Sequence, residues 1–97
     1  MKMTKVNRAV AKIQKAIDEI DEAVVTNDIK VLSAISASQL SKFKESLSIV
    51  LTIIKSDNIP PKKERVIGIS RVIVDQWPFD LELGNIIIEA EQAYKEI

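Results

Sequence analysis

The sequence predicts an all-α protein: a small antiparallel bundle, mostly up-and-down, with four main helices or three long and one or two short ones. Apolar residues recur at alternating spacings of three and four along most of the 97-residue chain, which is the helical pattern. The β-branched runs 72–74 and 86–88 show no two-residue alternation, and no Asn-Gly or Asp-Gly turn links apolar runs. A chain of this length fits one domain, spanning residues 1–97.

The strongest helical pattern comes first and predicts a helix from Thr4 to about Val25. Ala9, Ala16 and Ala23 accompany its apolar seam at a seven-residue period. Such a seam needs another helix to cover it. The seam residues are Val6, Val10, Ile13, Ile17, Ile20 and Val24.

A break and a short second helix are expected next. Residues 26–28 are poor helix formers, because their side chains compete for backbone hydrogen bonds. Asp28 is a suitable N-cap for a helix over residues 29–35. Ile29, Leu32 and Ile35 are expected on one side of this helix.

A second long helix is predicted to run to about Lys55, with Ser36 or Ser38 as its N-cap. Ser36 and Gln39 fit the capping-box pattern, in which each side chain satisfies a free amide of the other residue. Residues 49–54 are apolar on most sides, so we expect them to lie deepest. The apolar face of this helix consists of Leu40, Phe43, Leu47, Val50, Leu51 and Ile54.

Residues 56–61 form the clearest hinge, and Pro61 is well placed to begin a third helix that runs to about Trp77. Gly68 lies within this predicted helix and is interpreted as a point of close helix packing. Pro78 then ends it. The inward residues are expected to be Val66, Ile69, Ile73 and Trp77, flanked by Ile67 and Val74.

The last helix is predicted to begin after Asp80, a good N-cap, with Phe79 placed outside it as a possible hydrophobic staple. Gly84 in its first turn is interpreted like Gly68. The apolar face consists of Leu83, Ile86, Ile87, Ala90, Tyr94 and Ile97.

Composition excludes several function classes. The chain has neither cysteine nor histidine, so it lacks disulfides, the commonest transition-metal ligand and the usual general base near neutral pH. No catalytic, metal or cofactor site is predicted. The apolar runs are too short to indicate a signal peptide or a membrane span, so we expect a cytoplasmic protein. The formal net charge is zero, so no basic excess indicates a nucleic-acid partner and no acidic excess indicates a metal buffer or a DNA mimic.

The charges of the first helix run against its dipole, because basic residues begin it and acidic residues end it. The basic residues are Lys2, Lys5 and Arg8, and the acidic ones are Asp18, Glu19, Asp21 and Glu22. An antiparallel last helix would bring the acidic Glu89, Glu91 and Glu96 to the basic start. The acidic end has no such explanation, so these four residues are the first candidates for a partner-binding surface.

Trp77 and Phe79 are the second candidates, because exposed aromatic side chains anchor interfaces well. The alternative is that they close one end of the bundle. The basic residues Lys62, Lys63 and Arg65, with Arg71, suggest phosphate contacts only weakly, because Glu64 interrupts them and no aromatic residue lies between them.

The preferred function is a small protein-binding module that acts through a helical face on one partner. Inhibitors, immunity or antitoxin-type proteins, chaperones and phage- or plasmid-encoded modulators of host enzymes are of this type. The alternative is a structural protein that self-associates through the seam of the first helix. A helical nucleic-acid-binding regulator is the second alternative, and an enzyme is the least favoured.

Overall fold

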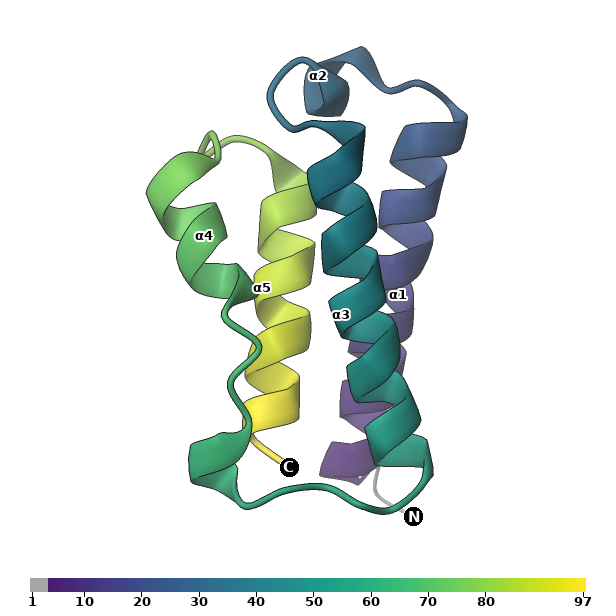
Figure 1. Cartoon of the computed structure of the whole chain (residues 1–97), viewed down its shortest axis with the longest axis vertical. Helices are drawn as coiled ribbons and strands as arrows, with labels where there is room; N and C mark the ends of the chain where they lie inside the picture. Colours follow the sequence, from purple (N-terminus) through teal and green to yellow (C-terminus); the bar gives the residue numbers. More distant parts are fainter. Residues whose placement is uncertain (1–3) are drawn as a thin grey trace.

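The computed structural model describes residues 4–97 and confirms the all-α class, because this part of the chain contains helices and no strands. The first long helix runs upward in Figure 1, the second long helix runs downward, a shorter helix runs upward again, and the last helix runs downward. The elements are α1 (Lys5–Val25), α2 (Ile29–Leu32), α3 (Ala37–Lys55), the 3-10 helix η1 (Lys62–Glu64), α4 (Ile69–Gln76) and α5 (Glu82–Lys95).

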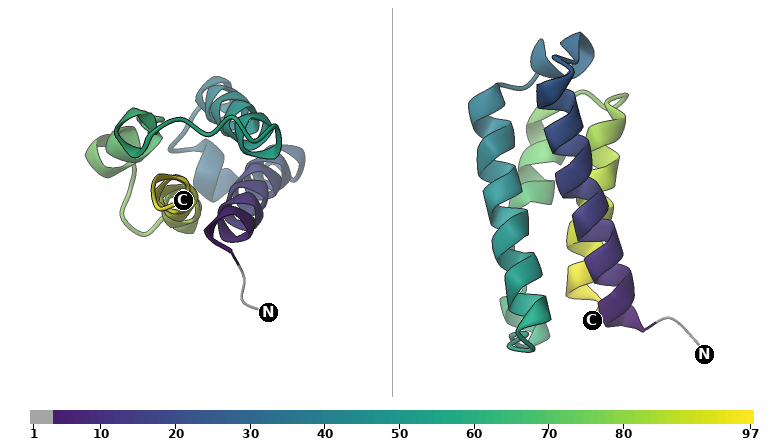
Figure 2. Two further views of the ribbon diagram at one scale, coloured as in Figure 1. Left: turned by 90° about the horizontal axis from the view of Figure 1, so that it is seen from below. Right: turned by 90° about the vertical axis from the view of Figure 1, so that its right-hand side faces the viewer.

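Helix α1 packs along two other helices, α3 and α5, and thereby joins the two halves of the bundle. The short α4 packs on α5. An end-on view shows the resulting order, with α3 beside α1, α1 beside α5 and α5 beside α4 (Figure 2). Within residues 4–97, no helix combines the length and the apolar composition needed to cross a lipid bilayer.

The seam of α1 is covered by helices of the same chain. Ile13, Ile17 and Ile20 are 0%, 7% and 1% exposed, and the three alanines beside them are also buried. Val6 and Val10 pack against the core from its edge, whereas Val24 at the helix end is 42% exposed. Self-association through this seam therefore requires the bundle to open.

Two predicted N-caps, Asp28 and Ser36, are confirmed, and the structure adds a third at Thr4. The hydroxyl of Thr4 accepts a hydrogen bond from the Asn7 amide at 3.0 Å, and that of Ser36 accepts one from the Gln39 amide at 3.1 Å. The carboxylate of Asp28 caps α2. These caps satisfy amides that the first turn of a helix leaves free.

Helix α2 is shorter than predicted and presents a partly different face. It ends at Leu32, so it forms a single turn. Of the three residues expected on one side, Ile35 is buried and Leu32 packs against the core, whereas Ile29 is 77% exposed. Val31 is also buried. A helix this short has no stability of its own, so the packing of Val31 decides its orientation.

The expectation that residues 49–54 lie deepest is wrong. Ile49 is 54% exposed, whereas Leu40 and Leu47 are fully buried. Because α3 is covered mainly by α1, the bundle buries one face of it. Apolar residues on its other faces remain at the surface.

The predicted helix from Pro61 to Trp77 is wrong in its first half. After η1 the backbone leaves the helical conformation, and α4 begins only at Ile69. Gly68 has φ +84°, a conformation that residues with a side chain rarely adopt, and a Cβ there would meet no atom within 4 Å. Val66, expected to face inward, is 70% exposed. Gly68 therefore serves backbone geometry and not close packing.

We expect Gly68→Ala to destabilise the protein by about 1–2 kcal/mol, because the left-handed conformation brings Cβ close to the following carbonyl oxygen. Gly68→Asn is the matched control, because asparagine tolerates this conformation better than alanine. Urea unfolding monitored by circular dichroism would compare the two. An alanine variant as stable as the parent would contradict the assigned conformation.

The start of α5 also differs from the prediction. Leu81 and not Asp80 is the N-cap, and Phe79 does not pack as a staple because it is 94% exposed. Leu81 is buried, and its amide donates to the Pro78 carbonyl at 3.2 Å, so packing of the leucine sets this turn. Close packing at Gly84 is confirmed: a Cβ there would lie 3.0 Å from a methyl carbon of Ile73 and 3.3 Å from the Trp77 ring.

Candidate functional site

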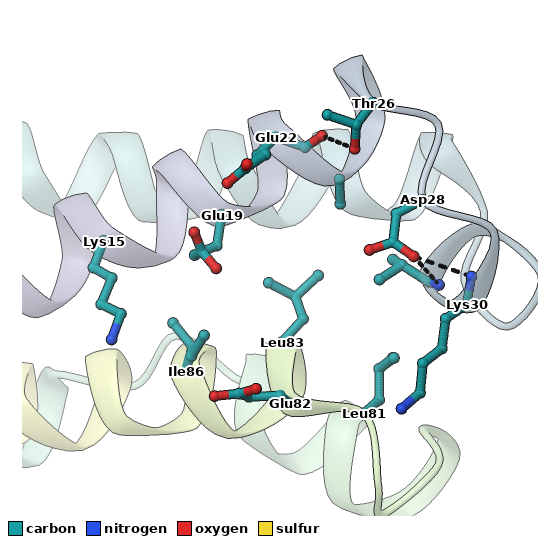
Figure 3. Close-up of a pocket in the computed structure, with 12 residues that line it drawn as sticks. Lys15, Glu19, Glu22, Thr26, Asp28, Lys30, Leu81, Glu82, Leu83 and Ile86 are labelled. Carbon is teal, nitrogen blue, oxygen red and sulfur yellow. Dashed lines mark hydrogen bonds between the residues drawn. The ribbon is translucent and has the colours of Figure 1, made fainter.

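A pocket of about 380 Å³ opens at one end of the bundle, between the end of α1, the α2 turn and the start of α5 (Figure 3). Three separate parts of the chain form it, so it exists only in the folded protein. Its apolar wall consists of Ala23, Val31, Leu81, Leu83 and Ile86.

Carboxylates outnumber lysines around this wall, four to two. Glu19 and Glu22 lie on α1, and Glu82 lies on the first turn of α5, on the opposite side of the pocket (Figure 3). Among residues 4–97, none of these three carboxylates forms an ion pair. Lys15 and Lys30 also line the pocket. The rim therefore has an excess of negative charge above an apolar wall.

The turn after α1 holds the outer end of the pocket in place. The Thr26 hydroxyl donates to the Glu22 carbonyl at 2.7 Å, which closes the helix. Asn27 takes the left-handed conformation at φ 55°, as asparagine tolerates better than most residues. The Asp28 carboxylate then accepts the Lys30 amide at 3.0 Å, so local hydrogen bonds define this rim.

The four acidic residues predicted as one surface divide into two pairs. Glu19 and Glu22 line the pocket. Asp21 forms an ion pair with Lys44 of α3 at 2.7 Å, and Asp18 accepts a hydrogen bond from Gln14 at 3.0 Å. Asp18 and Asp21 therefore stabilise their own surroundings and do not line the pocket.

Trp77 and Phe79 also occupy different environments. Trp77 is 5% exposed, and its ring stacks on Phe43 of α3 with centroids 5.6 Å apart. Its indole Nε1 is buried, and no residue between 4 and 97 accepts a hydrogen bond from it. Trp77 therefore belongs to the core, and only Phe79 projects into solvent.

Phe79 borders a second hollow, of about 130 Å³, formed by the end of α4, the following turn and the start of α5. Val74, which is 61% exposed, and Ile88 also line it. The buried Leu81 lines both hollows. The sequence prediction missed Glu82 and Leu81, although the expected antiparallel packing of the first and last helices places them opposite the acidic end of α1.

Exposed apolar side chains gather around the same end of the molecule. Val25 and Ile29, which flank the turn between α1 and α2, are 83% and 77% exposed. The turn that carries Phe79 lies at the same end of the bundle as α2 (Figure 1). This end thus combines apolar side chains with an acidic pocket.

The antiparallel packing of α1 on the last helix is confirmed (Figure 1), but the predicted pairing of charges is only partly formed. Lys12 of α1 forms an ion pair with Glu89 of α5 at 2.8 Å. This hydrogen-bonded lysine lowers the pKa of the Glu89 carboxyl. Lys12 is not one of the basic residues in that prediction, and Lys2, which is one, lies outside the described residues. Glu91, predicted to meet the basic start, instead contacts the start of α4.

Glu91 is a buried carboxylate whose role the sequence prediction missed. It is 2% exposed and accepts hydrogen bonds from the amides of Ile67 at 3.1 Å, Gly68 at 3.2 Å and Ser70 at 2.8 Å. Lys95 Nζ lies 3.7 Å from the same carboxylate. Glu91 therefore caps α4 from another helix.

A sequence signal for this role existed. Glu91 follows Ile87 by four residues and precedes Tyr94 by three, so it falls within the apolar face of the last helix. A charged residue at such a position is rarely buried without partners. The pattern therefore indicates a buried carboxylate, and the tertiary structure supplies its donors.

Arg65, predicted as part of a basic surface, is an internal residue. Its Nε donates to the Pro60 carbonyl at 2.7 Å, and its Nη1 donates to the main-chain oxygen of Ile97 at 2.8 Å. It is 9% exposed. The guanidinium thus links the segment before α4 to the end of α5. Lys62 and Lys63 are exposed, so Arg65 does not form a basic surface with them.

In residues 4–97, no three His, Cys, Asp or Glu side chains are grouped so that they would hold a metal ion. The arrangement at the acidic pocket is suited to binding a cationic group by charge and hydrogen bonds, with apolar contact beneath it. Comparisons of the sequence with protein-family models and with curated proteins give no match.

Proposed function

We propose that this protein is a small non-catalytic binding module that contacts one protein partner through the end of its bundle. Inhibitors, immunity or antitoxin-type proteins, chaperones and phage- or plasmid-encoded modulators of host enzymes act in this way. The observation that carries the proposal is the pocket between α1, α2 and α5, with an apolar wall and acidic rim. A chain without cysteine suits the cytoplasm, where we place it.

The physical support comes from how protein interfaces are built. They combine apolar anchors in their centre with polar groups around them. Val25, Ile29 and Phe79 are large apolar side chains left in water at the end of the bundle that carries the pocket (Figure 1). The pocket carboxylates Glu19 and Glu22 lack ion-pair partners within residues 4–97. Covering these groups with a partner removes apolar surface from water and satisfies the charges.

Affinity capture from a lysate of the native host, read by mass spectrometry, tests the proposal. We expect the tagged protein to retain one partner in stoichiometric amount. The variant Glu19→Lys with Glu22→Lys should lose it, because both substitutions reverse charge at the pocket. Phe79→Ser should weaken it, because the phenylalanine is exposed and contributes little to the core.

The matched control is Glu64→Lys with Glu96→Lys, which makes the same change of charge at the opposite end of the bundle (Figure 1). This control should retain the partner. Equal loss in both double variants would contradict the proposed surface and indicate a general charge effect. Recovery of the bait alone, in multiple copies, would favour the self-associating alternative.

A further inference from the structure

The acidic pocket has the properties of a receptor for one long cationic side chain. Its wall is apolar, which suits the methylene stem of lysine or arginine, and the carboxylates at its rim suit the charged head. Glu19 and Glu22 lie on one side and Glu82 on the other, so a head group between them would meet carboxylates from two helices (Figure 3).

The neighbouring hollow has the opposite character. Its lining is almost entirely apolar, with Asn85 as the polar exception, and the exposed Phe79 and Val74 border it. Leu81, a buried residue at the start of α5, lines both hollows. One extended segment that passes over the turn before α5 would reach both hollows.

We propose that this end of the bundle binds a polypeptide segment of the partner that places a Lys or Arg side chain in the acidic pocket and an apolar side chain beside Phe79. The inference rests on the proposed function and specifies its partner's chemistry. Charge complementarity selects the occupant of the first hollow, and the removal of apolar surface from water selects that of the second.

Selection from a phage-displayed library of random twelve-residue peptides against the full chain tests this inference. We expect the selected peptides to contain Lys or Arg, accompanied by large apolar residues, well above their frequency in the unselected library. The same selection is run against the triple variant Glu19→Gln, Glu22→Gln and Glu82→Gln. These substitutions remove charge with little change of shape, so the peptides selected by this variant should no longer be enriched in Lys or Arg.

The matched control is Glu45→Gln, Glu64→Gln and Glu96→Gln, three exposed carboxylates that do not line the pocket. It should select the same basic peptides as the parent. A peptide selected by the parent should bind the pocket triple variant at least about tenfold more weakly, because charge-assisted hydrogen bonds are lost. Phe79→Ala should lower the apolar preference and leave the basic one.

Peptides without an excess of Lys or Arg, or no selected peptide at all, would overturn the inference. So would spermidine binding that depends on the three pocket carboxylates without any basic preference among peptides, because the occupant would then be a free polyamine. If host-lysate capture still depends on Glu19 and Glu22 in any of these cases, the proposed function stands and only the partner chemistry fails.

Discussion

Replacing Glu91 by alanine should destabilise the protein by about 3 kcal/mol or more. Its carboxylate accepts hydrogen bonds from three partly buried amides, those of Ile67, Gly68 and Ser70. Each buried donor left without a partner costs roughly 1–3 kcal/mol, and water that enters this segment offsets part of that cost. Since small proteins are stable by about 5–15 kcal/mol in total, the loss is a large fraction. Urea unfolding measures it.

The matched control is Glu89→Ala, which removes a glutamate two residues away on the same helix. Glu89 is exposed and forms a surface ion pair with Lys12, and such pairs contribute little. A loss at Glu91 no larger than at Glu89 would contradict the capping role of Glu91. We expect α4 to be the first helix released in the Glu91 variant, because its amino-terminal amides lose their acceptor.

The same carboxylate should make stability depend on acid pH. Burial raises the pKa of Glu91, but hydrogen bonds from Ser70, Gly68 and Ile67 outweigh burial and lower it below its ordinary value of 4.5. The folded protein therefore releases this proton more readily than the unfolded chain does. Its contribution to stability is present above about pH 4.5 and is lost as pH falls through the lowered folded-state pKa.

Unfolding free energies of the parent and of Glu91→Gln, measured at pH 7 and then in steps down to pH 3, isolate this contribution. The glutamine cannot titrate, so the variant should lose less stability than the parent over this range. The lowered pKa of Glu89, which acts in the same direction, is common to both proteins and cancels in the comparison. Parallel pH curves for the two proteins would contradict the assignment.

Ile13→Ala should have the second large effect, a loss of about 2–5 kcal/mol. Ile13 is fully buried in the seam of α1, so truncation removes apolar contacts and leaves a cavity. Val24→Ala is the matched control within the same seam. Because Val24 is 42% exposed, we expect it to cost less than about 1 kcal/mol.

The unfolding midpoint of the Ile13 variant also separates an intramolecular seam from a dimer interface. If α3 and α5 cover the seam, the midpoint should not change with protein concentration. A midpoint that rises with concentration indicates that association and folding are coupled, as they are in obligate dimers. That result would contradict the bundle's own coverage of Ile13 and support self-association.

The sequence predicted part of the candidate site for a physical reason. Glu19 and Glu22 oppose the dipole of α1, and that misplacement is visible in the order of residues alone. The sequence did not separate them from Asp18 and Asp21, because an ion pair such as Asp21 with Lys44 depends on which helix packs beside α1. Likewise, only the packing of Phe43 against Trp77 distinguishes a core tryptophan from an exposed Phe79.

By itself, the sequence determined the all-α class, the extents of α1 and α3, the N-cap of α2, a serine N-cap for α3 and the antiparallel packing of α1 on α5. These follow from periodicity, capping residues and charge order, which act between residues close in the chain or along whole helices. Only the tertiary structure decided that residues 65–68 leave the helix. Gly68 permits that turn, but the carboxylate that holds its amides comes from Glu91, more than twenty residues later. The pocket also depends on the tertiary structure, because its walls meet only when α1, α2 and α5 pack together.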